Sequence, residues 1–496
     1  MNAPLRRVGI VIFVLFALLF ANLNWVQGYK ADSYRTSKYN GRVQLNAYQQ
    51  QRGSILDKNG VVLARSVATK DTLKYQRQYP YSAMFEPVIG YRPVNGLATG
   101  VEGAEDSFLN GTATDRLSDL FFTSASAGDN VSLTMIKSVQ QAAYNDLANN
   151  GAGGNVGAAV AIDPNTGAIL AMASTPSFNP TGLVSHDTSS ATHAYTAFNK
   201  QNPNPLVDRA TQERYPPGST FKVILSAAAL SRGYTPQTMV PAGSSYKPVP
   251  SSDFTMTNAE AETCPQAQIT LIQALTVSCN TAFAQLGVSL GSNTITQEAQ
   301  AFGFGDDSLT LAGSGDHTMP VAASVVGNMT TSSGNDDPNL VAQSSIGQYQ
   351  DQMTVMQGAM IAETVANGGA QMRPYLVQQI QDSDLHTTYA AQPSTLRTPI
   401  SPQVAAELDT MMQSVVQNGT ATSAQISGYI VAGKTGTAQN LPGAPNHRWF
   451  IGYASKDGHP IVAVAVLLVN AGNNGKKSAP KIAGDIMKAA ITAEGK

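Results

Sequence analysis

The chain opens with a long stretch of apolar residues. Residues 8–29 carry no charge, and residues 8–26 would form a helix about 28 Å long at ~1.5 Å per residue, close to the ~30 Å thickness of a bilayer's hydrocarbon layer. This pattern predicts a transmembrane anchor over residues 8–27, behind a cytoplasmic tail of residues 1–7. A cleavable signal peptide is the alternative, but no small-x-small cleavage site follows the apolar run, and Trp25 suits a membrane interface.

Two further patterns follow the anchor. Over residues 28–154, short alternating strands and turns predict a first, mixed α/β domain, with a hairpin turn at Lys58, Asn59 and Gly60. Near residue 155 the pattern of apolar and polar residues changes. The run AAVAIDPNTGAILAMAS predicts two short apolar strands joined by a turn. We therefore expect a second domain over residues 155–496.

The second domain is expected to combine helices with an antiparallel sheet, an α/β (α+β) fold. A helix should start at Ser219, which would cap it, and continue to about Ser231; a later helix is broken at SCN, which places Ser278 and Asn280 in a short connection. Further helices are expected over residues 353–367, 404–416 and 482–493, and strands over YIVAG, RWFIGYA and IVAVAVLLV. The sheet should start near residue 158 and finish with three antiparallel strands and a closing helix.

Composition narrows the class of protein. The 496 residues are 42% hydrophobic and 13% charged with a net charge of -2, which fits a folded protein and gives no basic surface for nucleic acid. The histidines form no H-E-x-x-H pattern and the two cysteines are not at metal-ligand spacing, so no metal or other cofactor is expected. Cys264 and Cys279 either form a disulfide, as an oxidising compartment would allow, or are two small buried apolar side chains.

Three short patterns carry candidate chemistry, and they occur in the order Ser219-Thr-Phe-Lys222, Ser278-Cys-Asn280 and Lys434-Thr-Gly-Thr437. In the first pattern, hydroxyl and ammonium lie one helical turn apart on one face, so Lys222 can reach the oxygen of Ser219 and act as its base. Lys222 must be neutral to accept a proton, and both burial and the charge of Lys434 would lower its pKa. Each pattern alone is common in helix starts, capping turns and strand ends, but their order and their elements favour one shared active site.

These residues resemble the three signature motifs of the penicillin-binding protein and serine β-lactamase superfamily. The runs PPGSTFK, AQSSIGQ, GKTGTAQ and HRWFIGYA resemble the transpeptidase domain of class B penicillin-binding proteins, and RGSILD and GVEGAEDSFLNG resemble their elongated N-terminal pedestal. The resemblance covers essentially the whole chain after the anchor. Within class B the chain is most similar to the actinobacterial penicillin-binding protein A type, which implies a peptidoglycan D,D-transpeptidase.

The resemblance implies a role for each motif residue. Ser219 would attack the penultimate D-alanine carbonyl of a stem peptide and form an acyl-enzyme, with Lys222 as its base, Ser278 as a proton relay and Asn280 as a holder of the substrate amide. The N–H groups of Ser219 and Thr437 would form the oxyanion hole. The residues implied in binding the substrate carboxylate and lining its strand are Lys434, Thr435, Gly436 and Thr437.

The resemblance also implies a cellular setting. The protein would lie in the cell membrane as a single-pass protein with its catalytic domain outside, act in septal wall synthesis during cell division, and be acylated by β-lactams. Glycosyltransferase or divisome partners would dock on the pedestal. Charge does not decide the orientation, because the basic residues beyond the anchor outnumber the two arginines before it, so the outward placement follows from the chemistry.

Other classes of protein match parts of the same sequence. Residues 428–435 satisfy the phosphate-binding pattern G-x-x-x-x-G-K-[ST], but a strand is expected where a P-loop needs a turn, and no helix is expected at the lysine. A β-lactamase would need a glutamate in an E-x-x-L-N run, and none follows Asn280. A D,D-carboxypeptidase shares the motifs and stays open, as does a β-lactam sensor or division scaffold without turnover, although the intact motif set argues against a scaffold.

Overall fold

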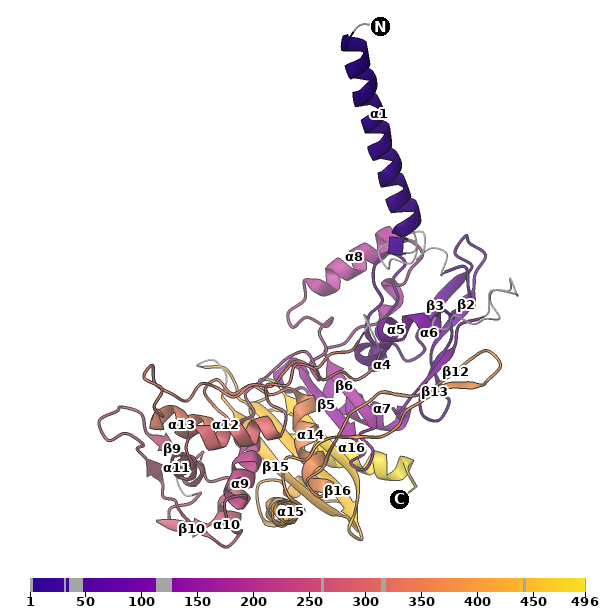
Figure 1. Cartoon of the computed structure of the whole chain (residues 1–496). Helices are drawn as coiled ribbons and strands as arrows, with labels where there is room; N and C mark the ends of the chain where they lie inside the picture. The colour runs from indigo at the N-terminus through magenta and orange to yellow at the C-terminus, as the bar shows by residue number, and fades with distance from the viewer. Residues whose placement is uncertain are drawn as a thin grey trace.

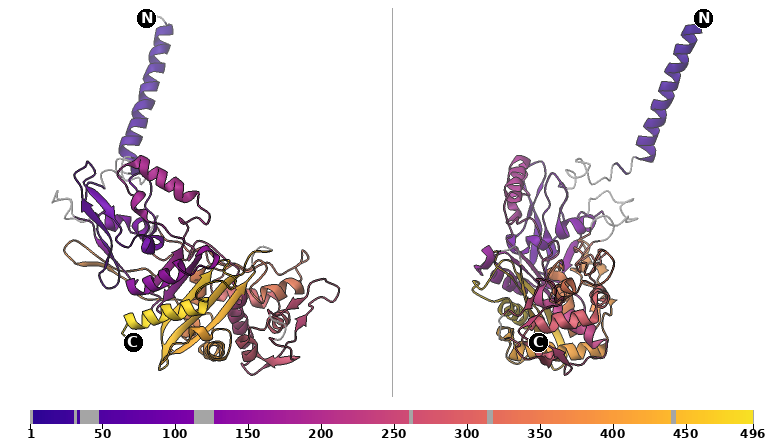
Figure 2. Two further views of the ribbon diagram at one scale, coloured as in Figure 1. Left: turned by 180° about the vertical axis from the view of Figure 1, so that it is seen from behind. Right: turned by 90° about the vertical axis from the view of Figure 1, so that its left-hand side faces the viewer.

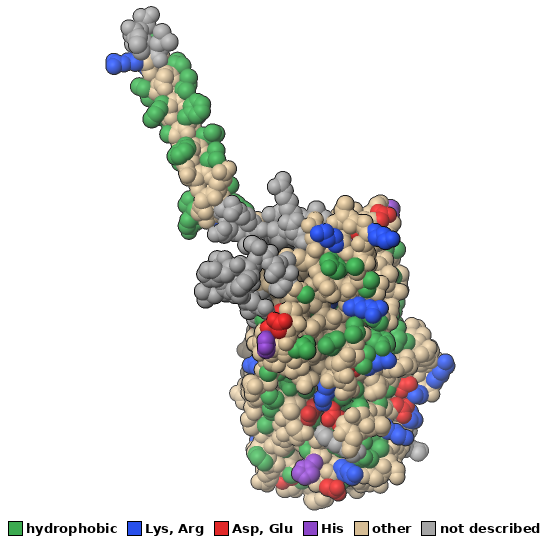
Figure 3. Space-filling model, turned by 90° about the vertical axis from the view of Figure 1, so that its right-hand side faces the viewer, with side chains coloured by type: hydrophobic (Ala, Val, Ile, Leu, Met, Phe, Trp, Pro, Cys, Tyr) green, Lys and Arg blue, Asp and Glu red, His purple; other side chains and the backbone are tan. Residues whose placement is uncertain are grey.

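A long N-terminal helix stands away from the rest of the protein (Figure 1). The computed structural model describes residues 3–30, 33–34, 48–112, 127–259, 263–313, 318–439 and 443–495. Helix α1 (Ala3–Asn24) continues into the π-helical turn η1 (Trp25–Tyr29), and residues 6–29 are long and apolar enough to cross a membrane, with a mean hydropathy of 2.2. Apolar side chains lie exposed along this helix (Figure 3), so the predicted apolar N-terminal helix is confirmed.

The largest sheet has five antiparallel strands in the order β15-β16-β17-β5-β6. Its strands are β5 (Gly157–Ile162), β6 (Ile169–Thr175), β15 (Ile430–Ala438), β16 (His447–Lys456) and β17 (His459–Leu468). β5 and β6 are buried along their whole length, because helices cover both faces of the sheet. The prediction of a sheet that starts near residue 158 and ends in three consecutive strands is confirmed.

Four helices sandwich this sheet (Figure 1). α14 (Val355–Ala366) and α15 (Pro402–Asn418) pack on one face, and α16 (Ala479–Ala493) and α7 (Lys137–Ala148) pack on the other. α14 is apolar on nearly every side and almost completely buried, as expected for a helix enclosed by other elements. The predicted helices over residues 353–367, 404–416 and 482–493 match these elements to within a few residues at each end.

A mostly helical region packs against the free side of β15 (Figure 1). Its main elements are the 3₁₀ turn η4 (Gly218–Phe221), α9 (Lys222–Leu230), α10 (Leu271–Thr276), α11 (Asn280–Leu290), α12 (Ser292–Ala301) and α13 (Pro338–Ser344). Short strand pairs at its rim join β7 (Met239–Pro241) to β10 (Gln268–Thr270) and β8 (Ser245–Tyr246) to β9 (Met256–Thr257). A disulfide links Cys264 to Cys279, with 6.0 Å between their Cα atoms.

A second sheet lies between α1 and the five-stranded sheet (Figure 2). Its order is β13-β12-β4-β1-β2-β3, from β1 (Ile55–Leu56), β2 (Val62–Ala68), β3 (Tyr75–Gln78), β4 (Asn130–Leu133), β12 (Val377–Gln381) and β13 (Thr387–Ala390). β1 and β2 form the hairpin predicted around Asn59. Elements from each side of the boundary expected at residue 155 pack with the other side. β12 and β13 belong to this sheet, and α7 packs on the five-stranded sheet.

A buried network of charges holds the elements around the second sheet together. Glu102, in the short helix α5 (Gly100–Ala104), accepts bonds from Arg52 Nε at 2.7 Å and from Arg77 Nε at 2.6 Å. Burial alone would raise the pKa of Glu102, but the guanidinium groups of Arg77 and Arg52 outweigh it and lower that pKa to about 2. Arg52 and Glu102 belong to the runs RGSILD and GVEGAEDSFLNG, so these runs meet in one structural ion cluster.

Candidate active site

The first motif forms the tight turn that leads into α9. Ser219 lies inside η4 and is half-buried, whereas Lys222 is the first residue of α9 and is fully buried. The prediction that Ser219 caps the helix is wrong, since the residue before the turn is Pro217 and no side chain caps either element. Gly218 has a φ of +54°, and an added Cβ would lie 2.5 Å from the carbonyl oxygen of Thr437, so the turn approaches β15 as only glycine allows.

Lys222 is oriented by the second motif. Its Nζ donates to Asn280 Oδ1 at 2.7 Å, to the Ser278 carbonyl oxygen at 2.9 Å and to Ser278 Oγ at 3.3 Å. Among the described residues its hydrogen bonds go to these acceptors and not to Ser219 Oγ, the partner expected from the spacing. A base of this kind often aligns with its nucleophile only when substrate is bound, because the substrate-free site satisfies the ammonium elsewhere.

The Ser278 side chain connects the two lysines through hydrogen bonds. It lies between α10 and α11 with a φ of +59°, an unusual conformation for a residue with a side chain. From there its Oγ accepts from Lys434 Nζ at 2.9 Å as well as from Lys222. The strained backbone is held in place by its neighbours, because Cys279 is tied into the disulfide and Asn258 Oδ1 accepts the N–H of Asn280 at 2.9 Å.

Burial lowers the pKa of both lysines at the site. It lowers the pKa of Lys434 from 10.5 to about 7, and burial, followed by the nearby charge of Lys434, lowers the pKa of Lys222 well below its ordinary value. Since no carboxylate is paired with either ammonium among the described residues, nothing offsets this desolvation. A neutral Lys222 amine is the form that a general base requires.

The third motif lies on β15, an outer strand of the five-stranded sheet. Lys434 points inward to Ser278, whereas Thr435 and Thr437 alternate with it and are half-buried. Gly436 packs closely against η4, since an added Cβ would lie 2.8 Å from the Pro217 carbonyl oxygen. The structure thus brings all three motifs to one edge of the sheet, where the outer side of β15, opposite its partner β16, can accept an extended peptide. The P-loop reading fails here, because residues 430–438 form one continuous strand.

Several residues at the site carried no signal in the sequence. Asn258 orients the start of α11, Trp449 Nε1 donates to the Pro216 carbonyl oxygen at 3.0 Å, and Thr420 Oγ1 is hydrogen-bonded to Thr435 Oγ1. Arg448 Nη1 donates to Thr437 Oγ1 at 2.5 Å. These contacts join segments that are distant in sequence, and the place of Arg448 beside Thr437 follows from the pairing of β15 with β16, which no local pattern gives.

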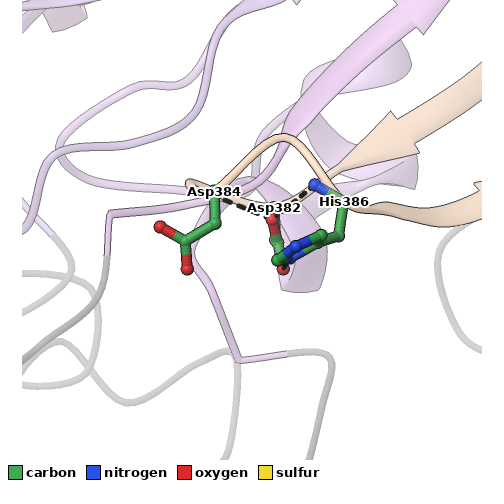
Figure 4. A group of neighbouring side chains, drawn as sticks. All are labelled: Asp382, Asp384 and His386. Carbon is green, nitrogen blue, oxygen red and sulfur yellow. Dashed lines mark hydrogen bonds and ion pairs between the residues drawn. The ribbon is translucent and has the colours of Figure 1, made fainter.

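One group of side chains has the composition of a metal site but lies away from the three motifs. The ligand atoms of Asp382, Asp384 and His386 lie within 4.8 Å of one another at the turn between β12 and β13 (Figure 4). Asp382 Oδ1 accepts the backbone N–H of Asp384 and of His386, both at 2.9 Å, so this carboxylate already closes the turn. The cluster belongs to the second sheet and supplies no group to the three motifs.

Two protein-family models match this chain, one in its N-terminal part and one in its C-terminal part. The model of the penicillin-binding protein transpeptidase domain matches residues 157–488, and the model of the penicillin-binding protein A dimerisation domain matches residues 52–131. The chain belongs to the class B penicillin-binding proteins, which confirms the resemblance inferred from its motifs and the fold class expected from it.

Individual relatives match over nearly the full chain. The peptidoglycan D,D-transpeptidase PbpA of Mycolicibacterium smegmatis is 38% identical over 501 residues, 99% of both chains. The PbpA of Mycobacterium tuberculosis is 36% identical over 504 residues, again 99% of both chains. The imipenem acyl-enzyme complex of penicillin-binding protein A from M. tuberculosis superposes with a TM-score of 0.80 at 36% identity and covers 90% of this chain and 100% of that one.

Proposed function

We propose that this protein is a peptidoglycan D,D-transpeptidase that forms an ester through Ser219 and passes the acyl group to an amine. The observation that carries the proposal is the chain of hydrogen bonds from Lys222 through Ser278 to Lys434, next to the turn that holds Ser219. The pKa values of both lysines are lowered, as this chemistry requires of the base. The names of the PbpA relatives and the acyl-enzyme structures of penicillin-binding protein A support the same reaction class.

Acylation uses the first motif. The neutral Lys222 amine takes the proton of the Ser219 hydroxyl as its oxygen attacks the penultimate D-alanine carbonyl of the donor stem. The negative charge that develops on the carbonyl oxygen is stabilised by the N–H groups of Ser219 and Thr437, and fixed donors of this kind contribute about 3–4 kcal/mol to the transition state. A β-lactam follows the same step and remains attached, because its leaving group stays tethered.

Departure of D-alanine and arrival of the acceptor use the second motif. When the C–N bond breaks, the leaving nitrogen takes a proton from Ser278 Oγ, which recovers one from the protonated Lys222 or from Lys434, both within hydrogen-bonding distance. The acceptor amine then attacks the ester and loses its proton along the same path in reverse. Asn280 accepts from Lys222 through Oδ1 and donates through Nδ2 to the Thr257 carbonyl oxygen at 3.1 Å, and the second N–H of that amide would hold the donor stem.

The cellular setting forms part of the proposal. With α1 as a membrane anchor, the body lies outside the cytoplasm, in agreement with the disulfide between Cys264 and Cys279, since such bonds persist in oxidising compartments. The septal role and the docking of glycosyltransferase or divisome partners on the pedestal, residues 28–154, rest on the family resemblance. Labelling of intact cells with a membrane-impermeant fluorescent penicillin tests the placement, and the position of the label along dividing cells tests the septal role.

The activity is tested with purified full-length protein in detergent. A pentapeptide that ends in D-Ala-D-Ala is mixed with an amine acceptor, and free D-alanine, cross-linked product and hydrolysed peptide are measured separately. We expect D-alanine and cross-linked product from the wild type and neither from Ser219→Ala. Release of D-alanine with hydrolysed peptide alone would instead identify a carboxypeptidase, and no release at all would leave the sensor or scaffold reading.

A further inference from the structure

The segment that leads into the nucleophile is held at both ends by backbone hydrogen bonds to a distant part of the chain. The Tyr215 N–H donates to the Met353 carbonyl oxygen at 3.0 Å, and the Met353 N–H donates to that of Tyr215 at 2.8 Å. Three residues further on, the Gly218 N–H donates to the Gly347 carbonyl oxygen at 2.9 Å. The segment of residues 344–353 (the clamp) therefore fixes the approach to the nucleophile.

The clamp, the turn that holds Ser219 and the third motif lie in direct backbone contact. A Cβ added to Gly347 would lie 2.2 Å from the Gly218 carbonyl oxygen. On the other side of the turn, a Cβ added to Gly218 would lie 2.5 Å from the Thr437 carbonyl oxygen. Since these layers touch without intervening side chains, a shift of the clamp passes directly to Ser219.

The side chain of Asp351 holds the clamp in shape. It is fully buried, and Ser344 Oγ donates to its Oδ2 at 2.8 Å and lies 3.0 Å from its Oδ1. The same Oδ1 accepts the Gly327 N–H at 2.8 Å. Ser344 is the last residue of α13, so these bonds tie the end of that helix and a neighbouring loop to the far end of the clamp.

This carboxyl group has no charged partner among the residues that the structure describes. Its bonds come from one hydroxyl and one backbone N–H, and none of the ion pairs in the described ranges includes it. Burial raises the pKa of Asp351 to about 7, and the bonds from Gly327 and Ser344 offset only part of the rise. A buried carboxylate without a cation is costly, and perturbed groups of this kind cluster at functional sites.

We propose that Asp351 is a positioning residue for acylation, which acts through the clamp to hold Gly218 and, with it, the hydroxyl and the N–H of Ser219. The inference rests on the proposed function and deepens it, since it assigns a part in the acylation step to a residue outside the three motifs. A misplacement of about 1 Å in a catalytic arrangement costs up to about 100-fold in rate. Loosening the clamp therefore slows acylation, whereas the initial non-covalent binding of a β-lactam uses other groups and is preserved.

The test separates binding from acylation. Full-length protein in detergent is mixed with benzylpenicillin over a range of concentrations, and intact mass follows the adduct. Saturation of the observed rate yields the rate constant of acylation and the Kd of the initial complex. The variants are Asp351→Ala, Asp351→Asn, Ser344→Ala and the double variant of Ser344→Ala with Asp351→Ala.

Glu363→Gln is the matched control. Glu363 on α14 is equally buried and accepts the Met372 N–H at 2.7 Å, as Asp351 accepts that of Gly327. Burial also raises the pKa of Glu363 well above its ordinary value. No hydrogen bond joins its side chain to a motif residue within the described ranges, so this variant measures the effect of neutralising a buried carboxylate alone.

We expect the rate constant of acylation to fall by about 10- to 100-fold in Asp351→Ala, with a Kd within about twofold of the wild-type value. Asp351→Asn keeps an oxygen for the Gly327 N–H and should recover most of the rate. Ser344→Ala should lose rate in the same direction, and the double variant should lose no more than Asp351→Ala, because both changes remove one interaction. Glu363→Gln should acylate at the wild-type rate.

Three results would overturn the inference while the proposed function stands: a wild-type rate constant in Asp351→Ala, a loss confined to Kd, or an equal loss in Glu363→Gln. Should Asp351→Ala fail to fold, Ser344→Ala decides the matter, and a wild-type rate constant there overturns the inference. Failure of the wild type to form any adduct would overturn the proposed function itself, so the two failures are distinguishable.

Discussion

The contact between η4 and β15 can be tested by adding a single methyl group at Gly436. A Cβ at this position would lie 2.8 Å from the Pro217 carbonyl oxygen, 2.9 Å from Thr220 Cγ2 and 2.9 Å from Trp449 Cβ. Restoring ordinary contacts of about 3.5 Å requires a movement of roughly 0.7 Å. Because Trp449 is buried on the neighbouring strand, the turn that carries Ser219 must move away from β15.

This displacement should affect acylation more than folding. Overpacking of a well-packed site costs about 1–3 kcal/mol, whereas a misplacement of about 1 Å in a catalytic arrangement costs up to about 100-fold in rate. We therefore expect Gly436→Ala to slow acylation by fluorescent penicillin by about 10- to 100-fold in a protein that still unfolds cooperatively on heating.

A matched glycine provides the control for this experiment. Gly182, remote from the motifs, is exposed, and an added Cβ would meet only the Ala194 Cβ at 3.4 Å. Gly182→Ala should therefore acylate at the wild-type rate. A wild-type rate in Gly436→Ala would refute the claim that the close approach of η4 to β15 positions Ser219.

Three further predictions follow from buried groups. Because Lys222 must be neutral to act as a base and burial lowers its pKa, acylation should slow as the pH falls through that pKa, and Lys222→Met should lose about 10²–10⁴-fold; a pH-independent rate would contradict this. Replacing Cys264 and Cys279 with alanine should cost about 3 kcal/mol, because the disulfide closes a loop of 15 residues; equal denaturant midpoints with and without the bond would disprove it. Since the pKa of Glu102 falls from 4.5 to about 2 on folding, it contributes about 3 kcal/mol above pH 4.5 that is lost as the pH drops toward 2, and Glu102→Gln should remove this acid dependence of unfolding.

The elements with a clear local pattern were predictable from the sequence. The three closing strands are runs of apolar residues of the right length, and the helix after Ser219 follows from its composition, so β15, β16, β17 and α9 appear close to their expected places. The motifs were recognisable for the same reason, since each is a short local pattern whose element could be assigned.

Long-range pairing could not be read from the same patterns. Nothing local in residues 377–390 marks β12 and β13 as strands of the second sheet, because β12 joins that sheet by pairing with β4, more than 200 residues earlier in the chain, and β13 follows by pairing with β12. The same holds for the partner of Lys222, which spacing along a helix assigned to Ser219 and the tertiary structure assigns to Ser278 and Asn280. The charge of Arg448 beside Thr437 appears only once the register of β15 and β16 is known.

The most direct test of the central claim is to locate the penicillin adduct in the sequence. Full-length protein is treated with benzylpenicillin, digested and mapped by tandem mass spectrometry, alongside Ser219→Ala. The account predicts one stable adduct on the peptide that contains Ser219 and none in the variant. An adduct on another residue, or on the same peptide in Ser219→Ala, would contradict it.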